Sequence, residues 1–201
     1  MQPPGASDVL QHWLNRLREG DPAARNELIR HSQESLRRLT ARMLRHYPAV
    51  REWEETSDVF QNVLARLAGA LLTASVATAE ELFWLASALI RRELIDLTRH
   101  LLGPEGPARH LHPPGHHTAA EPAAETDSSH DPYRLALWGE LHRAIAELPE
   151  GERRLFDLIY YQGRSVPEAA VVLGAPERSL RRHWQEVRLR FLDCFGDDLP
   201  F

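Results

Sequence analysis

The sequence predicts an all-α protein in which a flexible linker joins two small helical domains. Apolar residues recur every three to four positions through most of the 201 residues, as they do on one face of an α-helix. No segment sustains the alternation of apolar and polar residues that is typical of a half-buried strand. Proline, glycine and histidine gather in the middle of the chain. The domains are therefore expected at 1–102 and 134–201, with the linker at 103–133.

The N-terminal domain is expected to contain four helices. Each is predicted from an apolar stripe with helical spacing, and the four stripes lie within residues 9–17, 22–47, 56–68 and 79–101. Gly20 is expected to end the first helix. Asp21 and Pro22 predict the start of the second, because aspartate caps helix N-termini and proline suits the first helical position. Pro48 is expected to close that helix.

Residues 103–133 are expected to form the linker. They include six prolines, three glycines and five histidines, and they have almost no large apolar residues with which to bury a core. Five acidic residues against one arginine give the segment most of the net charge of -5. Its imidazoles could bind a transition metal, but they lack a fixed geometry, so no metal site is expected at His110, His112, His116 and His117.

The C-terminal domain is expected to contain a helix-turn-helix. Its helices are predicted at 134–147, 152–161, 166–173 and 177–195. The third of these is short, and the turn Gly174-Ala175-Pro176 joins it to the last, which is the pattern of a helix-turn-helix. Ala169 and Ala170 are small enough for a tight crossing of the two helices. An ordinary helical hairpin is the alternative interpretation.

The last helix is predicted to have a basic outer face. Its spacing turns an apolar stripe inward, formed by Leu180, Trp184, Val187 and Phe191. The outward side then carries Arg178, Arg181, Arg182, Gln185 and Arg188. Arginine and glutamine can hydrogen-bond the edges of guanine and adenine, so these side chains are candidates for DNA contact. A solvated basic face is the alternative.

Composition limits the possible functions. All 24 basic residues are arginine, so no P-loop or Schiff-base lysine exists, and a single cysteine excludes an internal disulfide. The negative net charge argues against a free-standing, non-specific nucleic-acid binder, so any DNA contact has to be local or helped by a partner. No apolar run approaches the ~20 residues of a membrane helix, and the N-terminus lacks signal-peptide features. A cytoplasmic protein is expected.

Three motifs carry a resemblance to a known family. The C-terminal domain contains Leu148-Pro149-Glu150, Ser165-Val166-Pro167-Glu168-Ala169-Ala170 and Ser179-Leu180-Arg181, which look like the promoter -35 domain of bacterial sigma-70 factors. Asp58-Val59-Phe60-Gln61-Asn62-Val63 resembles the segment that docks on the polymerase clamp, and Arg91-Arg92-Glu93-Leu94-Ile95-Asp96-Leu97-Thr98-Arg99 resembles the helix that reads the -10 element. The two-domain layout is similar to that of extracytoplasmic-function (ECF) sigma factors, in a form found in a planctomycete-like branch. Ser179-Leu180 departs from the family's usual Thr-Val pair.

The resemblance implies roles for particular residues. The resemblance assigns contact with core RNA polymerase to Asp58, Gln61 and Asn62. The spacing of these three residues puts them on one helix face. Contact with the -10 element falls to Arg91, Arg92, Asp96, Arg99 and His100. Contact with the -35 element falls to Arg178, Ser179, Arg181, Arg182, Gln185 and Arg188. Asp96 has a second possible role, since it could instead fix an arginine in an i,i+4 pair.

The resemblance also implies the function and the partners. The chain would be a promoter-specificity subunit and no enzyme, with core RNA polymerase and promoter DNA as its partners and no cofactor. An anti-sigma factor or another regulator is a further candidate partner. A free-standing helix-turn-helix regulator with an N-terminal dimerisation or sensor domain is the alternative. A helical phosphohydrolase would need His-Asp metal ligands, and the one adjacent pair of this kind, His130-Asp131, lies in the linker.

Overall fold

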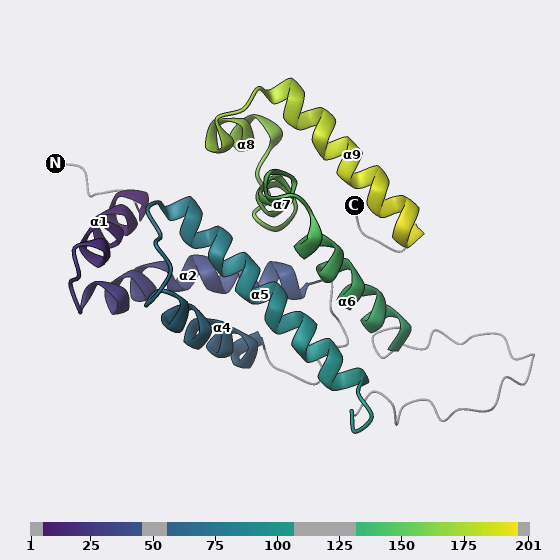
Figure 1. Cartoon of the computed structure of the whole chain (residues 1–201), viewed down its shortest axis with the longest axis horizontal. Coiled ribbons are helices and arrows are strands. Elements are labelled where there is room, and N and C mark those ends of the chain that lie inside the picture. The colour runs from purple at the N-terminus through teal and green to yellow at the C-terminus, as the bar shows by residue number, and fades with distance from the viewer. Residues whose placement is uncertain (1–5, 46–55, 107–131, 197–201) are drawn as a thin grey trace, which may run out of the picture.

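The computed structural model describes residues 6–45, 56–106 and 132–196, and it is helical throughout (Figure 1). No strand occurs in these three ranges, which confirms the predicted all-α class. The elements in chain order are α1 (Ala6–Arg18), α2 (Ala24–Leu44), α4 (Thr56–Ala70), α5 (Ala79–Leu102), α6 (Pro132–Glu147), α7 (Glu150–Phe156), the π-helical turn η3 (Asp157–Tyr161), α8 (Val166–Leu173) and α9 (Glu177–Phe195). No helix in the described ranges has the length and the apolar character needed to cross a membrane.

The four N-terminal helices form a bundle. Helix α1 packs on α2, and α4 packs on both α2 and α5. The predicted apolar stripes supply its core, whose fully buried members include Leu14, Leu28, Leu36, Val63, Leu67, Leu82 and Ile90. The bundle presents one side of α4 and one side of α5 as long helical surfaces, and the candidate polar residues lie on these two helices.

Helix α2 begins later than the sequence predicts. Pro22 and Ala23 form a turn, and the helix starts at Ala24. The Asp21 carboxylate accepts a hydrogen bond from the backbone N–H of Ala23 at 2.9 Å and pairs with Arg16 at 2.8 Å. Asp21 therefore caps a turn that precedes the helix. An aspartate side chain can accept a hydrogen bond from the backbone two residues further on, and this bond stabilises a turn as well as a helix end.

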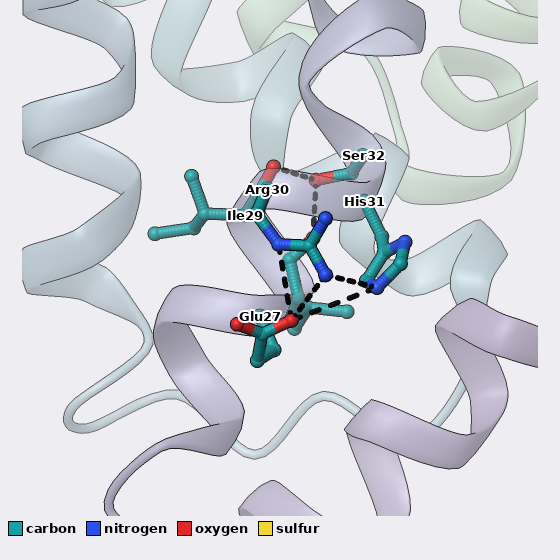
Figure 2. Close-up of polar contacts among 6 residues, drawn as sticks. Glu27, Ile29, Arg30, His31 and Ser32 are labelled. Carbon is teal, nitrogen blue, oxygen red and sulfur yellow. Dashed lines mark hydrogen bonds and ion pairs between the residues drawn. The ribbon is translucent and has the colours of Figure 1, made fainter.

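Side chains on α2 join it to α1. Arg30 pairs with Glu27 one turn earlier, and its guanidinium also lies 2.9 Å from Nε2 of His31 (Figure 2). The hydrogen bond from Arg30 lowers the pKa of Glu27. The His31 ring stacks on Trp13 of α1 with centroids 6.2 Å apart. On the buried side, the Ser32 hydroxyl donates to the Leu28 carbonyl at 2.8 Å, so this polar group is satisfied inside the bundle.

Helices α8 and α9 form the predicted helix-turn-helix. A capping box starts α8: the Ser165 hydroxyl accepts from the Glu168 N–H, and the Glu168 carboxylate accepts from the Ser165 N–H at 2.8 Å. Gly174 ends the helix in the left-handed conformation, with φ 60° and ψ 31°. Ala169 is fully buried at the crossing, as its size predicts. Together with α7 and η3, the two helices enclose a small core formed by Leu155, Leu158, Ala169 and Leu180.

The π-helical turn is a feature that the sequence does not predict. The pattern predicts one helix over 152–161, but the structure has α7 followed directly by η3, where the Gln162 N–H donates to the Asp157 carbonyl at 2.9 Å. The turn buries Asp157, Leu158 and Tyr161. The Tyr161 hydroxyl lies 3.0 Å from Nδ1 of His142 on α6, and this contact ties α6 to the π-helical turn that precedes the helix-turn-helix.

One apolar core extends through both parts of the chain. Helix α6 packs along α5 (Figure 1), and the core combines Leu94 and Leu101 of α5 with Trp138, Leu141 and Ile145 of α6. A Cβ atom on Gly139 would lie 2.7 Å from Cγ2 of Thr98, so only glycine allows this approach. The predicted linker lies mostly outside the described residues, between Gly106 and Pro132.

Candidate nucleic-acid interface

Helix α9 has the two faces that its spacing predicts. Leu180, Val187 and Phe191 are buried, and Trp184 packs against both apolar clusters. The opposite side exposes Arg178, Arg181, Arg182 and Gln185, while Ser179 and Arg188 are half-buried. This arrangement presents a row of guanidinium groups over the first turns of the second helix of the motif, which is where recognition helices meet base edges.

The arginines of α9 differ in their neighbours. Arg181 pairs with Glu177, and Arg182 lies 3.5 Å from the Glu186 carboxylate, both one helical turn away. Exposed pairs of this kind contribute little, so a phosphate group can replace the carboxylate at small cost. Arg178 has no ion-pair partner within the described part of the chain. Among the exposed arginines of α9 it is therefore the one most available to an incoming ligand.

Helix α4 exposes the three residues expected to meet the polymerase. Asp58, Gln61 and Asn62 all lie on its solvent side, opposite the buried Val59 and Val63. The structure thus brings the three together, as their spacing predicts. The Asn62 amide also donates to the Glu93 carboxylate of α5 at 2.9 Å, so this side chain is held in place.

A polar network joins α4 to α5. Arg66 of α4 lies 2.8 Å from the Glu93 carboxylate and 3.1 Å from the Asp96 carboxylate. Asp96 therefore fixes an arginine, but the partner belongs to another helix and is not the i,i+4 neighbour that the sequence offers. Sequence reasoning missed Arg66 and Glu93 as part of the site, because only the packing of the two helices brings them together.

Most of the expected -10 residues on α5 are accessible. Arg92, Arg99 and His100 are exposed, and Asp96 is half-buried. Arg92 also lines a cleft of about 480 Å³ between α5 and α7, whose other walls include Trp84, Arg153 and Arg154. The Arg154 guanidinium lies over the Trp84 ring, 4.0 Å from its centroid. Cations therefore gather along the side of α5 that faces the C-terminal helices.

Comparison with known protein families identifies the chain. The family model described as "ECF sigma factor" matches residues 7–194, which includes both helical parts and all of the candidate site residues. The chain belongs to the ECF sigma factor family. It is accordingly a transcription initiation factor that binds DNA and RNA polymerase, and ECF sigma factors are not enzymes. No curated protein matches this ECF sigma factor. The planctomycete-like branch is a finer assignment that stays a prediction.

Arg91 is the exception among the -10 residues of the ECF sigma factor. The sequence predicts a DNA contact, but its side chain is buried, at 2% exposure, and pairs through both terminal nitrogens with the Asp157 carboxylate of η3. Burial raises the pKa of Asp157, and the charge of Arg91 opposes that shift. In this arrangement Arg91 cannot reach DNA, because the C-terminal part of the chain covers it.

No metal centre is visible in the described parts of this ECF sigma factor. Nowhere in residues 6–45, 56–106 and 132–196 do three histidine, cysteine, aspartate or glutamate side chains meet as a metal site would require. The histidine cluster at 110–117 falls outside these ranges. The prediction that these histidines form no metal site therefore stays a prediction.

Proposed function

We propose that this ECF sigma factor binds core RNA polymerase and directs it to promoters through their -10 and -35 elements. The match to the family over residues 7–194 carries the proposal, because it includes both helical parts in one chain. Such a factor acts on promoter DNA in the bacterial cytoplasm. An anti-sigma factor or another regulator would be a further partner. The polymerase supplies much of the affinity, which agrees with a net charge of -5 on the chain itself.

Helix α4 is the proposed polymerase contact. Asp58, Gln61 and Asn62 form an exposed polar face that can pair with basic groups on a clamp helix. The double substitution Asp58→Ala with Gln61→Ala should weaken co-purification with core polymerase and leave the helical content unchanged. Asp193→Ala, which removes an exposed carboxylate from α9, is the matched control. Unchanged co-purification of the double variant would exclude α4 as the contact.

Helix α5 is the proposed reader of the -10 element. Its exposed Arg92, Arg99 and His100 can hold the phosphate backbone of melting DNA, and Asp96 positions Arg66 beside them. Arg91 belongs to the same helix and would join this group once the C-terminal helices move away. Arg99→Ala should reduce open-complex formation on a promoter found by run-off transcription with purified core polymerase.

Helix α9 is the proposed reader of the -35 element. A base-reading arginine contributes ~1–3 kcal/mol of discrimination, whereas a phosphate contact weakens all sequences alike. At least one of Arg178→Ala, Arg181→Ala and Arg182→Ala should therefore relax the preference at one -35 position. Gln185 is exposed on the same face and is a further candidate for a base contact, and the half-buried Ser179 lies beside Arg178. Arg188→Ala should mainly lower affinity and its salt dependence.

The decisive experiment is transcription from a library of -35 substitutions with each variant holoenzyme. If none of the four arginine variants alters specificity or strength, α9 does not read promoter DNA. The alternative, a free-standing helix-turn-helix regulator, predicts DNA binding by the isolated chain and no co-purification with core polymerase. The same purified components therefore separate the two functions.

A further inference from the structure

Three arginines from distant parts of the chain line one cleft that the proposed function does not use. This arginine cleft has a volume of about 310 Å³ and lies between α2 and the end of η3. Arg38 and Arg42 come from the same face of α2, one turn apart, and Arg164 comes from the loop that joins η3 to α8. Among the described residues, no aspartate or glutamate lines the cleft. Its walls therefore bring together three positive charges and no negative one.

The turn that ends η3 holds two of these arginines in place. Arg42 donates a hydrogen bond to the Gln162 carbonyl. Gly163 follows with φ 68°, and a Cβ atom there would lie 3.5 Å from Nη1 of Arg42. The backbone N–H of Arg164 then donates to the Leu158 carbonyl at 2.9 Å. The backbone of Arg164 is therefore fixed only two residues from the carbonyl that Arg42 binds.

The nearest carboxylates compensate these charges poorly. Arg38 lies 3.9 Å from the Glu34 carboxylate, and both side chains are exposed. Arg164 lies 4.0 Å from the Glu168 carboxylate, which is already engaged in the capping box of α8. Arg42 has no ion-pair partner in the part of the chain that the structure describes. Because exposed pairs contribute little, an incoming anion can replace these carboxylates at small cost.

A smaller cavity of about 160 Å³ continues the arginine cleft toward the start of α5. The two spaces share four lining residues, which are Ser35, Phe83, Gln162 and Arg164. The rings of Phe83 and Trp84 line this aromatic cavity, together with the Glu80 carboxylate. The indole N–H of Trp84 is buried without a hydrogen-bond partner among the described residues, although buried donors are normally paired. The continuous space is thus cationic at one end and aromatic at the other.

We propose that the arginine cleft and the aromatic cavity together bind a nucleoside diphosphate. The three arginines hold its phosphates, because guanidinium groups bind phosphate oxygens through paired, charge-assisted hydrogen bonds. Three cations can neutralise more charge than the about -1.5 to -2 of one phosphate monoester at neutral pH, which favours a diphosphate. The base stacks on Phe83 or Trp84, and Glu80 accepts a hydrogen bond from a ribose hydroxyl or an amino group. None of these residues has a proposed role in binding polymerase or promoter DNA.

Calorimetric titration of the free, full-length chain with ADP, GDP, pyrophosphate and adenosine tests the site. At least one of the two nucleotides should bind more tightly than pyrophosphate or adenosine, because each of these fragments fills only one end of the space. Arg38→Gln and Arg164→Gln should each raise the Kd of that nucleotide about 10-fold, as expected for one charge-assisted hydrogen bond. Arg37→Gln is the matched control. It removes the neighbouring cation of α2, which lies over the Phe60 ring, and should leave the Kd unchanged.

A further variant separates the two ends of the site. Phe83→Leu keeps an apolar side chain but removes a ring, so it should weaken nucleotide binding and leave the affinity for pyrophosphate unchanged. Arg38 and Arg164 are exposed, so their substitution should preserve the helical content, which circular dichroism checks. The absence of nucleotide binding at millimolar concentration, equal affinities for nucleotide and pyrophosphate, or one common Kd for the three arginine variants would overturn the proposal. None of these measurements involves polymerase or promoter DNA, so a negative result leaves the proposed function standing.

Discussion

The turn of the helix-turn-helix allows a direct test of how the motif is built. Gly174 has φ 60° and ψ 31°, and a Cβ atom added there would meet nothing within 4 Å. The cost of Gly174→Ala is therefore confined to the backbone, because no neighbour has to move. Residues other than glycine pay ~1–2 kcal/mol in this conformation, and asparagine pays less than alanine. We expect Gly174→Ala to lower the free energy of unfolding by about that amount and Gly174→Asn to lower it less.

A second glycine supplies the matched control. Gly69 lies in the last turn of α4 in a helical conformation, and a Cβ atom there also meets open space. The same glycine-to-alanine change should stabilise the protein at this position, by no more than the ~0.5–1 kcal/mol of a helix interior. Urea unfolding followed by far-ultraviolet circular dichroism measures both variants. Equal stabilities for Gly174→Ala and the wild type, or for the alanine and asparagine variants, would show that the left-handed turn does not hold α8 against α9.

Three further substitutions have expected outcomes. Tyr161→Phe removes the buried hydroxyl beside His142 and should cost ~1–2 kcal/mol in urea unfolding, whereas Tyr133→Phe, on an exposed ring, should cost far less. Ser165→Ala removes one half of the capping box and should cost ~1 kcal/mol at neutral pH. Hydrogen bonds from Ser165 lower the pKa of Glu168, so the capping box stabilises α8 fully at pH values above the ordinary pKa of glutamate. The cost of Ser165→Ala should shrink as the pH falls through the lowered pKa, because Glu168 then becomes protonated. Arg66→Met leaves the buried Glu93 without its cation and should destabilise the protein more than Arg38→Met, whose glutamate partner is exposed; thermal unfolding compares the two.

The sequence predicted those parts of the fold that depend on neighbouring residues. The spacing of Leu180, Val187 and Phe191 identified the buried side of α9, and Gly174 identified the end of α8. Both signals operate within a few residues, where backbone preference and helical period decide the result. The start of α2 was missed by two residues, because an aspartate followed by proline can cap either a helix or a turn.

The site was predicted less completely, since its polar contacts join distant parts of the chain. Helical period places Arg91 beside Arg92 and cannot show that one is covered and the other exposed. Its partner Asp157 lies 66 residues away, inside a π-helical turn that has no recognised sequence pattern. Arg66 and Glu93 were missed for the same reason. In both cases the pairing follows from how helices pack, which single-helix patterns do not contain.

The π-helical turn also makes the position of the helix-turn-helix depend on chain length. Each residue of an α-helix rotates the chain by 100° around the helix axis. A π-helical turn contains one extra residue, so a regular α-helix would leave this segment in the same direction with one residue fewer. Deleting Ile159 or Tyr160 would let α7 continue as a regular helix and keep everything after it nearly in register. Inserting a residue elsewhere in α7 would instead rotate α8 and α9 by about a quarter turn around the helix axis. A one-residue deletion in this turn should therefore leave the directions of α8 and α9 nearly unchanged, whereas a one-residue deletion elsewhere in α7 should rotate both.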